Sequence, residues 1–173
     1  MITVQLNWNE VEIAADAGKL RFIAPIRQGQ NNRYGARNDW TNDIHSCLAE
    51  LAVAKATNQY WHAAPAQYDG SNLLQERSKI KNDVGEDLEV RTSRTNKLIV
   101  RSGDKDERLY VLVSWPKWTK DGCVLSILGG MRAWEAKKDK YVETFGRDNR
   151  PPCFAVPPSD LVAPESFLNI DKT

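Results

Sequence analysis

The run LYVLV, residues 109–113, constrains the fold of this chain more than any other feature. Apart from Tyr110, both faces of an extended strand with this sequence would be apolar, which is typical of a central strand that is covered on both sides. We expect helices to provide that cover. Three further β-type runs lie at residues 88–93, 98–102 and 123–129. Together the runs predict a mixed sheet of four to five strands, flanked by helices.

A long helix is predicted ahead of these strands, over residues 44–60. The segment IHSCLAELAVAKATNQY is rich in strong helix formers. A polar loop over residues 29–43 precedes it and ends in the capping candidates Thr41, Asn42 and Asp43. At 3.6-residue spacing, one stripe of this helix carries Ile44, Leu48, Leu51 and Lys55.

Glu50 lies off that stripe of the predicted helix. One turn to either side of it are Cys47 and Ala54, so its carboxylate emerges from a face of small residues. Small side chains allow a neighbouring element to pack closely. Glu50 is therefore placed where another part of the chain can reach it.

The two ends of the chain add shorter elements. Residues 2–6 read as a strand, and apolar spacing predicts a helix that follows it until Pro25 interrupts. A short helix is expected within residues 131–145. The prolines around residues 154–156 predict an edge strand there.

The composition of the 173 residues, 41% apolar and 27% charged, is typical of one globular domain. We expect a single α/β domain, made of an N-terminal strand, helix and loop (1–40), a core (41–160) and a tail (161–173). Lys and Arg number 24 against 23 for Asp and Glu, so overall charge gives no argument for binding nucleic acid. Three separated cysteines and the lack of a signal-like or long apolar segment predict a cytoplasmic protein without a membrane span.

Residues 82–100 carry the chemistry-bearing pattern. Strand alternation puts Glu89 and Arg91 on one face. Asp83 is followed by Gly85, whose conformational freedom permits a tight turn that brings Asp83 back beside Glu89. Two carboxylates in close proximity repel each other unless one is protonated or a cation lies between them. In the cytosol, Mg²⁺ with oxygen ligands is the natural candidate.

This order of residues resembles the PD-(D/E)XK nuclease superfamily, whose pattern is an acidic residue on a first helix, then an Asp, then (Asp/Glu)-x-Lys on a strand. Glu50, Asp83 and Glu89 match that pattern. The chain is also similar to small phage-type proteins of that superfamily, which share a helix like HSCLAELAVAKA, then DVG, EVR, YVLV and ILGG. The resemblance covers roughly residues 41–160. It implies a restriction-endonuclease-like core that hydrolyses phosphodiester bonds.

The resemblance also implies roles for individual residues. Asp83, Glu89 and the Val90 carbonyl would bind Mg²⁺ or Mn²⁺, and Glu50 would orient water or reach a second ion. Arg91 stands where the superfamily has Lys. An arginine keeps its proton near neutral pH, so Arg91 can stabilise developing charge but cannot act as a general base.

Basic residues near these carboxylates could contact nucleic acid, with DNA the favoured partner. Seven lie within 25 positions, interleaved with acidic ones, and a plain solvated surface explains them equally well. A homodimer is also compatible with the pattern. Tryptophans could stack on bases, although large aromatics serve more often as core or surface anchors. The residues singled out as nucleic-acid contacts are Lys79, Lys81, Arg94 and Lys97.

Two non-enzymatic interpretations stay open at the level of sequence. The same fold could serve as a non-catalytic module that binds nucleic acid or protein. The chain could also be an interaction domain, in which Asp83 is a turn residue and Glu89 and Arg91 form a surface ion pair worth ~0.2 to 1 kcal/mol. Its exposed tryptophans would then be the first place to seek a partner.

Overall fold

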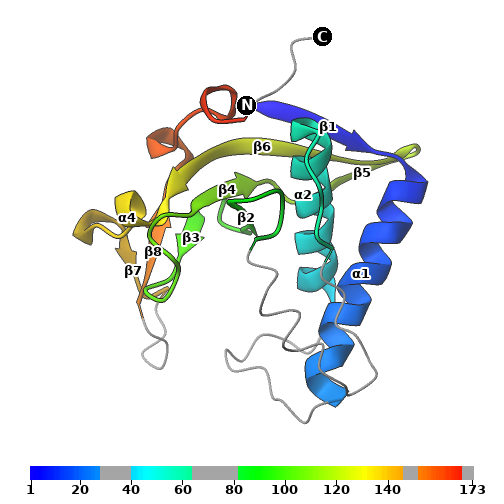
Figure 1. The fold of residues 1–173 in the computed structure, drawn as a ribbon, viewed down its shortest axis with the longest axis horizontal. Coiled ribbons are helices and arrows are strands. Elements are labelled where there is room, and N and C mark those ends of the chain that lie inside the picture. Colours follow the sequence, from blue (N-terminus) through cyan, green and yellow to red (C-terminus); the bar gives the residue numbers. More distant parts are fainter. Residues whose placement is uncertain (28–39, 64–81, 146–151, 169–173) are drawn as a thin grey trace.

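The computed structural model describes residues 1–27, 40–63, 82–145 and 152–168. Its centre is a five-stranded mixed sheet in the order β1-β6-β4-β2, with β5 also paired to β6 (Figure 1). Strand β2 runs parallel to β4, and the other pairs are antiparallel. The strands are β1 (Ile2–Leu6), β2 (Leu88–Thr92), β4 (Leu109–Val113), β5 (Lys117–Thr119) and β6 (Gly122–Arg132). The predicted mixed sheet of four to five strands is confirmed.

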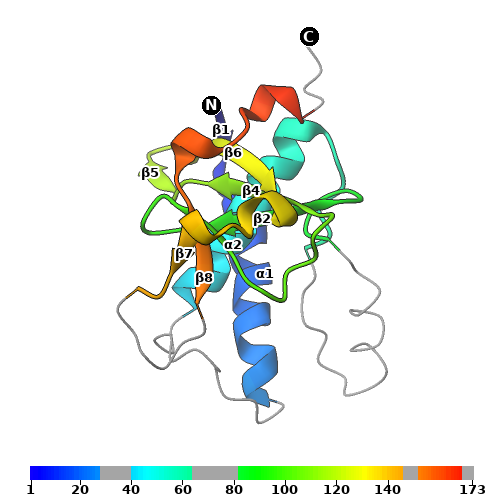
Figure 2. The same cartoon turned by 90° about the vertical axis from the view of Figure 1, so that its left-hand side faces the viewer.

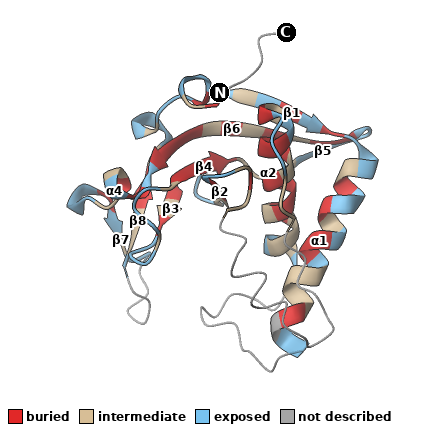
Figure 3. Ribbon diagram, viewed as in Figure 1, coloured by how far each residue is buried: buried red, intermediate tan, exposed pale blue. Residues whose placement is uncertain are grey.

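Two helices cover one face of this sheet, α1 (Trp8–Arg27) and α2 (Thr41–Thr57). Alternate side chains of β1, β2, β4 and β6 point to them and form the larger apolar core. Helix α2 lies closest to the sheet and is buried around most of its circumference, as Figure 3 shows. It begins at Thr41, three residues earlier than the helical pattern predicts, and the capping position is Trp40, with no side-chain cap.

The other face of the sheet is covered mainly by a second, three-stranded sheet in the order β3-β8-β7. Figures 1 and 2 show this small sheet and the short helix α4 on the side of β4 away from α1 and α2. A second apolar cluster, which includes Tyr110 and Leu112 of β4, fills the space between. These elements are β3 (Leu98–Val100), α4 (Ala133–Ala136), β7 (Val142–Glu143) and β8 (Cys153–Val156), with 3-10 turns at Asp139–Tyr141, Pro158–Asp160 and Pro164–Ser166.

Strand β4 is buried over all five residues, as its sequence predicts. Helices lie on both faces of β4, as expected: α1 and α2 cover one face, and the short α4 lies with the second sheet on the other. The expectation of an edge strand around residues 154–156 is wrong. Strand β8 is central in that sheet, between β3 and β7, and not at its edge, because its prolines flank the paired residues without interrupting them. Helix α1 also continues through Pro25 to Arg27.

Residues 161–168, predicted to be part of a tail, pack against β6. The amides of Gly130 and Val162 each donate to the other residue's carbonyl at 3.0 Å. The ring of Phe167 lies where a Cβ on Gly130 would be, and Leu168 is 4% exposed within the main core. None of the helices among the described residues is long and apolar enough to cross a membrane.

Replacing Gly18 with Ala is expected to lower the free energy of unfolding by about 1 to 3 kcal/mol, because the helices cross closely at this residue. A Cβ on Gly18 would lie 2.6 Å from Cα and 2.7 Å from N of Ile44 in α2. The better helix propensity of Ala does not offset that overlap. Urea denaturation measures the loss. Gly103→Ala is the matched control, since nothing lies within 4 Å of its Cβ position, and equal effects of the two changes would contradict this packing.

Candidate functional site

Asp83 is positioned by a tight turn that leads into β2. Val84 and Leu88 exchange backbone hydrogen bonds of 3.2 and 3.3 Å, which close the turn. Gly85 adopts φ +56°, a left-handed conformation that suits glycine, and a Cβ there would overlap the Gln59 side chain. Its amide also donates to the Tyr60 carbonyl at 2.9 Å, so the turn is tied to the segment that follows α2.

The Asp83 side chain lies along the open edge of β2, the edge that is not paired with β4. Its Oδ2 accepts a hydrogen bond of 2.8 Å from the Val90 amide. In an extended strand the carbonyl of a residue points the same way as its amide, so the Val90 carbonyl faces this edge too. Burial raises the pKa of Asp83, and the neighbouring Glu89 carboxylate raises it further. Asp83 and Glu89 are therefore close enough to repel, as the sequence suggests.

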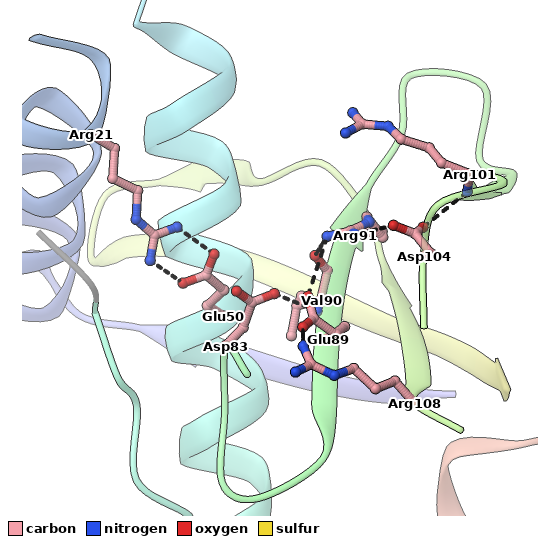
Figure 4. Close-up of polar contacts among 9 residues, drawn as sticks. All are labelled: Arg21, Glu50, Asp83, Glu89, Val90, Arg91, Arg101, Asp104 and Arg108. Carbon is pink, nitrogen blue, oxygen red and sulfur yellow. Dashed lines mark hydrogen bonds and ion pairs between the residues drawn. The ribbon is translucent and has the colours of Figure 1, made fainter. Parts of the chain in front are cut away.

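Glu89 is held by two arginines (Figure 4). Arg108, the residue that precedes β4, donates to Glu89 Oε1, and Nη1 of Arg91 lies 3.7 Å from Glu89 Oε2. The parallel register pairs Glu89 with Tyr110, so its side chain belongs to the face that carries the small sheet. The Glu89 and Arg108 side chains are only 13% and 12% exposed, which strengthens their attraction compared with that of a surface pair.

Arg91 has further partners besides Glu89. Its Nη2 lies 3.5 Å from Asp104 Oδ1, and its guanidinium lies 5.0 Å from the centre of the Tyr110 ring. Asp104 is oriented in turn by the Arg101 amide, which donates to its Oδ2 at 2.9 Å. Burial raises the pKa of Tyr110 to about 12, so its phenol stays neutral under Arg91. These contacts give Arg91 a defined position beside Glu89.

Glu50 lies on the other side of β2, on α2, and is 3% exposed. Arg21 of α1 donates to both of its oxygens, at 2.5 and 2.6 Å, and the Trp61 indole donates to Oε2 at 3.0 Å (Figure 4). Burial raises the pKa of Glu50, although the bonds from Arg21 oppose that shift. Helix α1 thus packs near the small-residue face of α2 and places Arg21 against Glu50.

The three carboxylates of the predicted site follow one another around the edge of β2. Glu50 approaches from the helical face, Asp83 lies at the edge, and Glu89 projects from the opposite face because strand alternation turns Val90 toward the helices. Among the described residues no three His, Cys, Asp or Glu side chains are close enough to hold one metal ion. The strand itself keeps Glu50 away from Glu89.

A smaller set of oxygen atoms lies around β2: Asp83, Glu89 and the Val90 carbonyl, which are ligands of the kind that Mg²⁺ and Mn²⁺ prefer. Arg91 Nη1 donates to the Val90 carbonyl at 3.5 Å, and both oxygens of Glu89 have arginine neighbours. Burial, and after it the Glu89 charge, raises the pKa of Asp83, while Arg91 and Arg21 oppose the rise. Within the described residues Asp83 also has no arginine ion-pair partner, unlike Glu50 and Glu89.

Of the residues predicted to contact nucleic acid, Arg94 and Lys97 lie in the turn between β2 and β3. Lys79 and Lys81 lie outside the described residues. Arg94 is exposed and lies over the Trp115 ring, 4.7 Å from its centre. The His45 ring also contacts Trp115, in an edge-on arrangement with 4.4 Å between ring centres. Lys97 Nζ lies 3.7 Å from a carboxylate oxygen of Glu143.

The tryptophans have different roles. Trp61 is a hydrogen-bond donor to Glu50, and its backbone bridges Val84 in the turn that carries Asp83. Trp40 and Trp134 are about half exposed. Trp118, also exposed, stacks on Trp8 with 6.3 Å between ring centres.

Sequence reasoning placed Arg91 beside Glu89 but missed Arg21, Arg108 and Asp104. Arg108 and Asp104 lie in the charged segment that precedes β4, and they reach β2 because the two strands are parallel and start side by side. Arg21 meets Glu50 across 29 positions of sequence. Only the charged run at 104–108 was visible as a signal, and its target depends on strand pairing.

No protein-family model, curated protein or solved structure matches this chain. The site is therefore defined by its own geometry, a row of four carboxylates and three arginines around β2. Three of the carboxylates, Glu50, Asp83 and Glu89, follow one another, and arginines contact the two outer ones. The members of this row are Arg21, Glu50, Asp83, Glu89, Arg91, Arg108 and Asp104.

Proposed function

We propose that this protein is a metal-dependent nuclease that hydrolyses phosphodiester bonds at the edge of β2, with DNA as the favoured substrate. The observation that carries the proposal is the position of Asp83. Its carboxylate accepts a hydrogen bond from the Val90 amide and lies beside Glu89, and burial together with the Glu89 charge raises its pKa. A carboxylate pair of this kind is a common way to build a site for a divalent cation.

In this proposal Asp83, Glu89 and the Val90 carbonyl hold Mg²⁺ or Mn²⁺. The ion, when bound, lowers the pKa of water and neutralises phosphate charge. Arg91 stabilises the negative charge that develops on the phosphate, since its guanidinium is already placed by Asp104 and Tyr110. Arg91 does not accept a proton near neutral pH, so water itself must be activated without a lysine.

Glu50 is given a positioning role in this mechanism. Its carboxylate holds Arg21 and the indole of Trp61, and the Trp61 backbone bridges Val84, next to Asp83. The Arg21–Glu50 pair therefore fixes the segment from which Asp83 projects. Glu50 is separated from Glu89 by the width of β2.

A second candidate is a non-catalytic module on the same fold that binds nucleic acid. One observation favours it: both oxygens of Glu89 already have arginine neighbours, so a cation must compete for them. Exposed Arg94, over Trp115, would then belong to a binding surface. Such a module would bind with a strong dependence on salt and without turnover.

Cleavage of plasmid, linear double-stranded and single-stranded DNA, and of RNA, in Mg²⁺ or Mn²⁺ tests the proposal. We expect wild type to cut at least one substrate and Asp83→Asn to cut it about 100-fold more slowly or worse, since the charge that attracts the cation is lost. Asp87→Asn is the matched control. Asp87 is an exposed carboxylate four residues further along the same turn, so its variant should cut like wild type.

Two results would sink the nuclease proposal. In the first, wild type leaves every substrate intact with either ion. In the second, Asp83→Asn cuts as fast as wild type. Salt-dependent binding of nucleic acid without cleavage would favour the non-catalytic module instead.

A further inference from the structure

Of the two arginines on Glu89, Arg108 is the one without a second acidic partner among the described residues. Its guanidinium donates to Glu89 Oε1, and among the described residues no other side chain contacts it through a hydrogen bond or ion pair. Its side chain is 12% exposed, so little solvent reaches the pair. Arg108 therefore depends on Glu89 alone for its compensating charge.

Arg91, the other cation on Glu89, is held differently. It lies 3.7 Å from Glu89 Oε2 but also contacts Asp104 at 3.5 Å and covers the Tyr110 ring. Loss of Glu89 would leave Arg91 with both of these partners. Of the two arginines, only Arg108 would lose every side-chain partner in the described structure.

A divalent cation held by Asp83 and Glu89 must take an oxygen of Glu89. Asp83 Oδ2 already accepts the Val90 amide, so Asp83 offers the cation its Oδ1. On Glu89, the cation must compete with arginine, because Arg108 donates to Oε1. A guanidinium and a divalent ion that share one carboxylate lie only a few ångströms apart. They repel each other strongly where water is largely excluded. The arginine without a second anchor is the one that will move.

We propose that Arg108 exchanges Glu89 for a phosphate group of the substrate when a divalent cation occupies Asp83 and Glu89. This inference rests on the proposed function, because it names a substrate-binding residue of the same site. A guanidinium released from a carboxylate is suited to a phosphate, whose oxygens accept the same pair of parallel N–H donors. Arg108 precedes β4, which pairs with β2, so its side chain begins on the β4 side of β2 and reaches Glu89 from there.

Titration calorimetry with Mn²⁺ at pH 7.5 tests the exchange. Arg108→Ala removes the competing cation, so we expect Mn²⁺ to bind about tenfold more tightly than to wild type. The same variant should cleave about 100-fold more slowly, because it lacks the phosphate contact. Arg108→Lys keeps a charge and should show a smaller change in both. Lys19→Ala, which removes an exposed cation paired with Asp16 on α1, is the control and should match wild type in both assays.

The outcomes separate this inference from the proposed function. If Asp83→Asn abolishes Mn²⁺ binding but Arg108→Ala leaves its affinity unchanged or weaker, the exchange is overturned and the nuclease proposal stands. If Arg108→Ala binds Mn²⁺ more tightly and still cleaves at the wild-type rate, the phosphate contact is overturned. If wild type and Arg108→Ala both fail to bind Mn²⁺, both proposals are overturned. Should Arg108→Ala not fold, the affinity and rate of Arg108→Lys decide by the same criteria.

Discussion

Replacing Arg21 with Met is expected to lower the free energy of unfolding by about 3 to 5 kcal/mol, the usual cost of leaving a buried charge without its partner. Glu50 is 3% exposed and receives both of its arginine hydrogen bonds from Arg21. In Arg21→Met the carboxylate retains the Trp61 indole as a donor, which cannot supply a charge. Urea denaturation at pH 7.5 measures the loss.

The double variant Arg21→Met with Glu50→Met should recover most of that stability, because a buried ion pair is often replaceable by apolar side chains of similar volume. Lys19→Met provides the surface control, since its ion pair with Asp16 is exposed and is worth about 1 kcal/mol or less. A loss below about 1 kcal/mol in Arg21→Met would contradict the buried pair described here.

At acidic pH the free energy of unfolding of Arg21→Met should lie closer to that of wild type. Burial already raises the pKa of Glu50, and removal of Arg21 takes away the contact that opposes this shift. A carboxyl group with a raised pKa in the folded state contributes stability below its unfolded pKa and loses it as pH rises through the folded pKa. The variant should therefore approach wild type as pH falls from 7.5 toward 5, and a constant deficit would show that Glu50 does not take up a proton.

Asp83→Asn and Glu89→Gln are expected to change stability in opposite directions, although the two carboxylates are neighbours. Asn can still accept the hydrogen bond from the Val90 amide, but it removes a carboxylate whose pKa is raised by burial and by Glu89. We therefore expect the free energy of unfolding to rise by about 1 kcal/mol. Gln leaves Arg108, whose side chain is only 12% exposed, without a carboxylate, and we expect a loss of about 2 to 3 kcal/mol. Both variants should lose cleavage activity.

Thermal and urea unfolding of these two variants, beside Asp87→Asn, checks the contrast. For Asp83 the sign is the same as for Glu50: its stabilising contribution is present at low pH and is lost as pH rises through its raised pKa. The gain in Asp83→Asn should thus be largest near neutral pH and shrink toward acid pH. If both variants destabilise equally, the charge pattern along β2 is not as described.

Some parts of this structure could be predicted because they depend on neighbours in sequence. The apolar run of β4 requires burial on both faces, and the small residues around Glu50 permit a close helix contact. The turn at Gly85 that returns Asp83 to Glu89 follows from six residues of local sequence. Each of these inferences needed only side-chain size, spacing and backbone freedom.

Other parts could not be predicted, because they depend on which strands pair. Strand β3 has the sequence of a main-sheet strand, yet it pairs with β8 to form the small sheet. Arg108 reaches Glu89 only because β2 and β4 run parallel from the same end. The pairing of Glu50 with Arg21 depends on how α1 crosses α2 near Gly18.

The sequence by itself determined a mixed sheet around β4, a helix that presents Glu50, and an Asp83–Glu89 pair at one turn, since periodicity and local geometry govern all three. The tertiary structure alone decided which charges face these carboxylates. The packing of α2 on one face of the sheet places Glu50 there, and strand alternation turns Glu89 to the other face. Parallel pairing brings Arg108 to Glu89. Partners of this kind come from distant segments, and no local pattern specifies which of several arginines a buried carboxylate will meet.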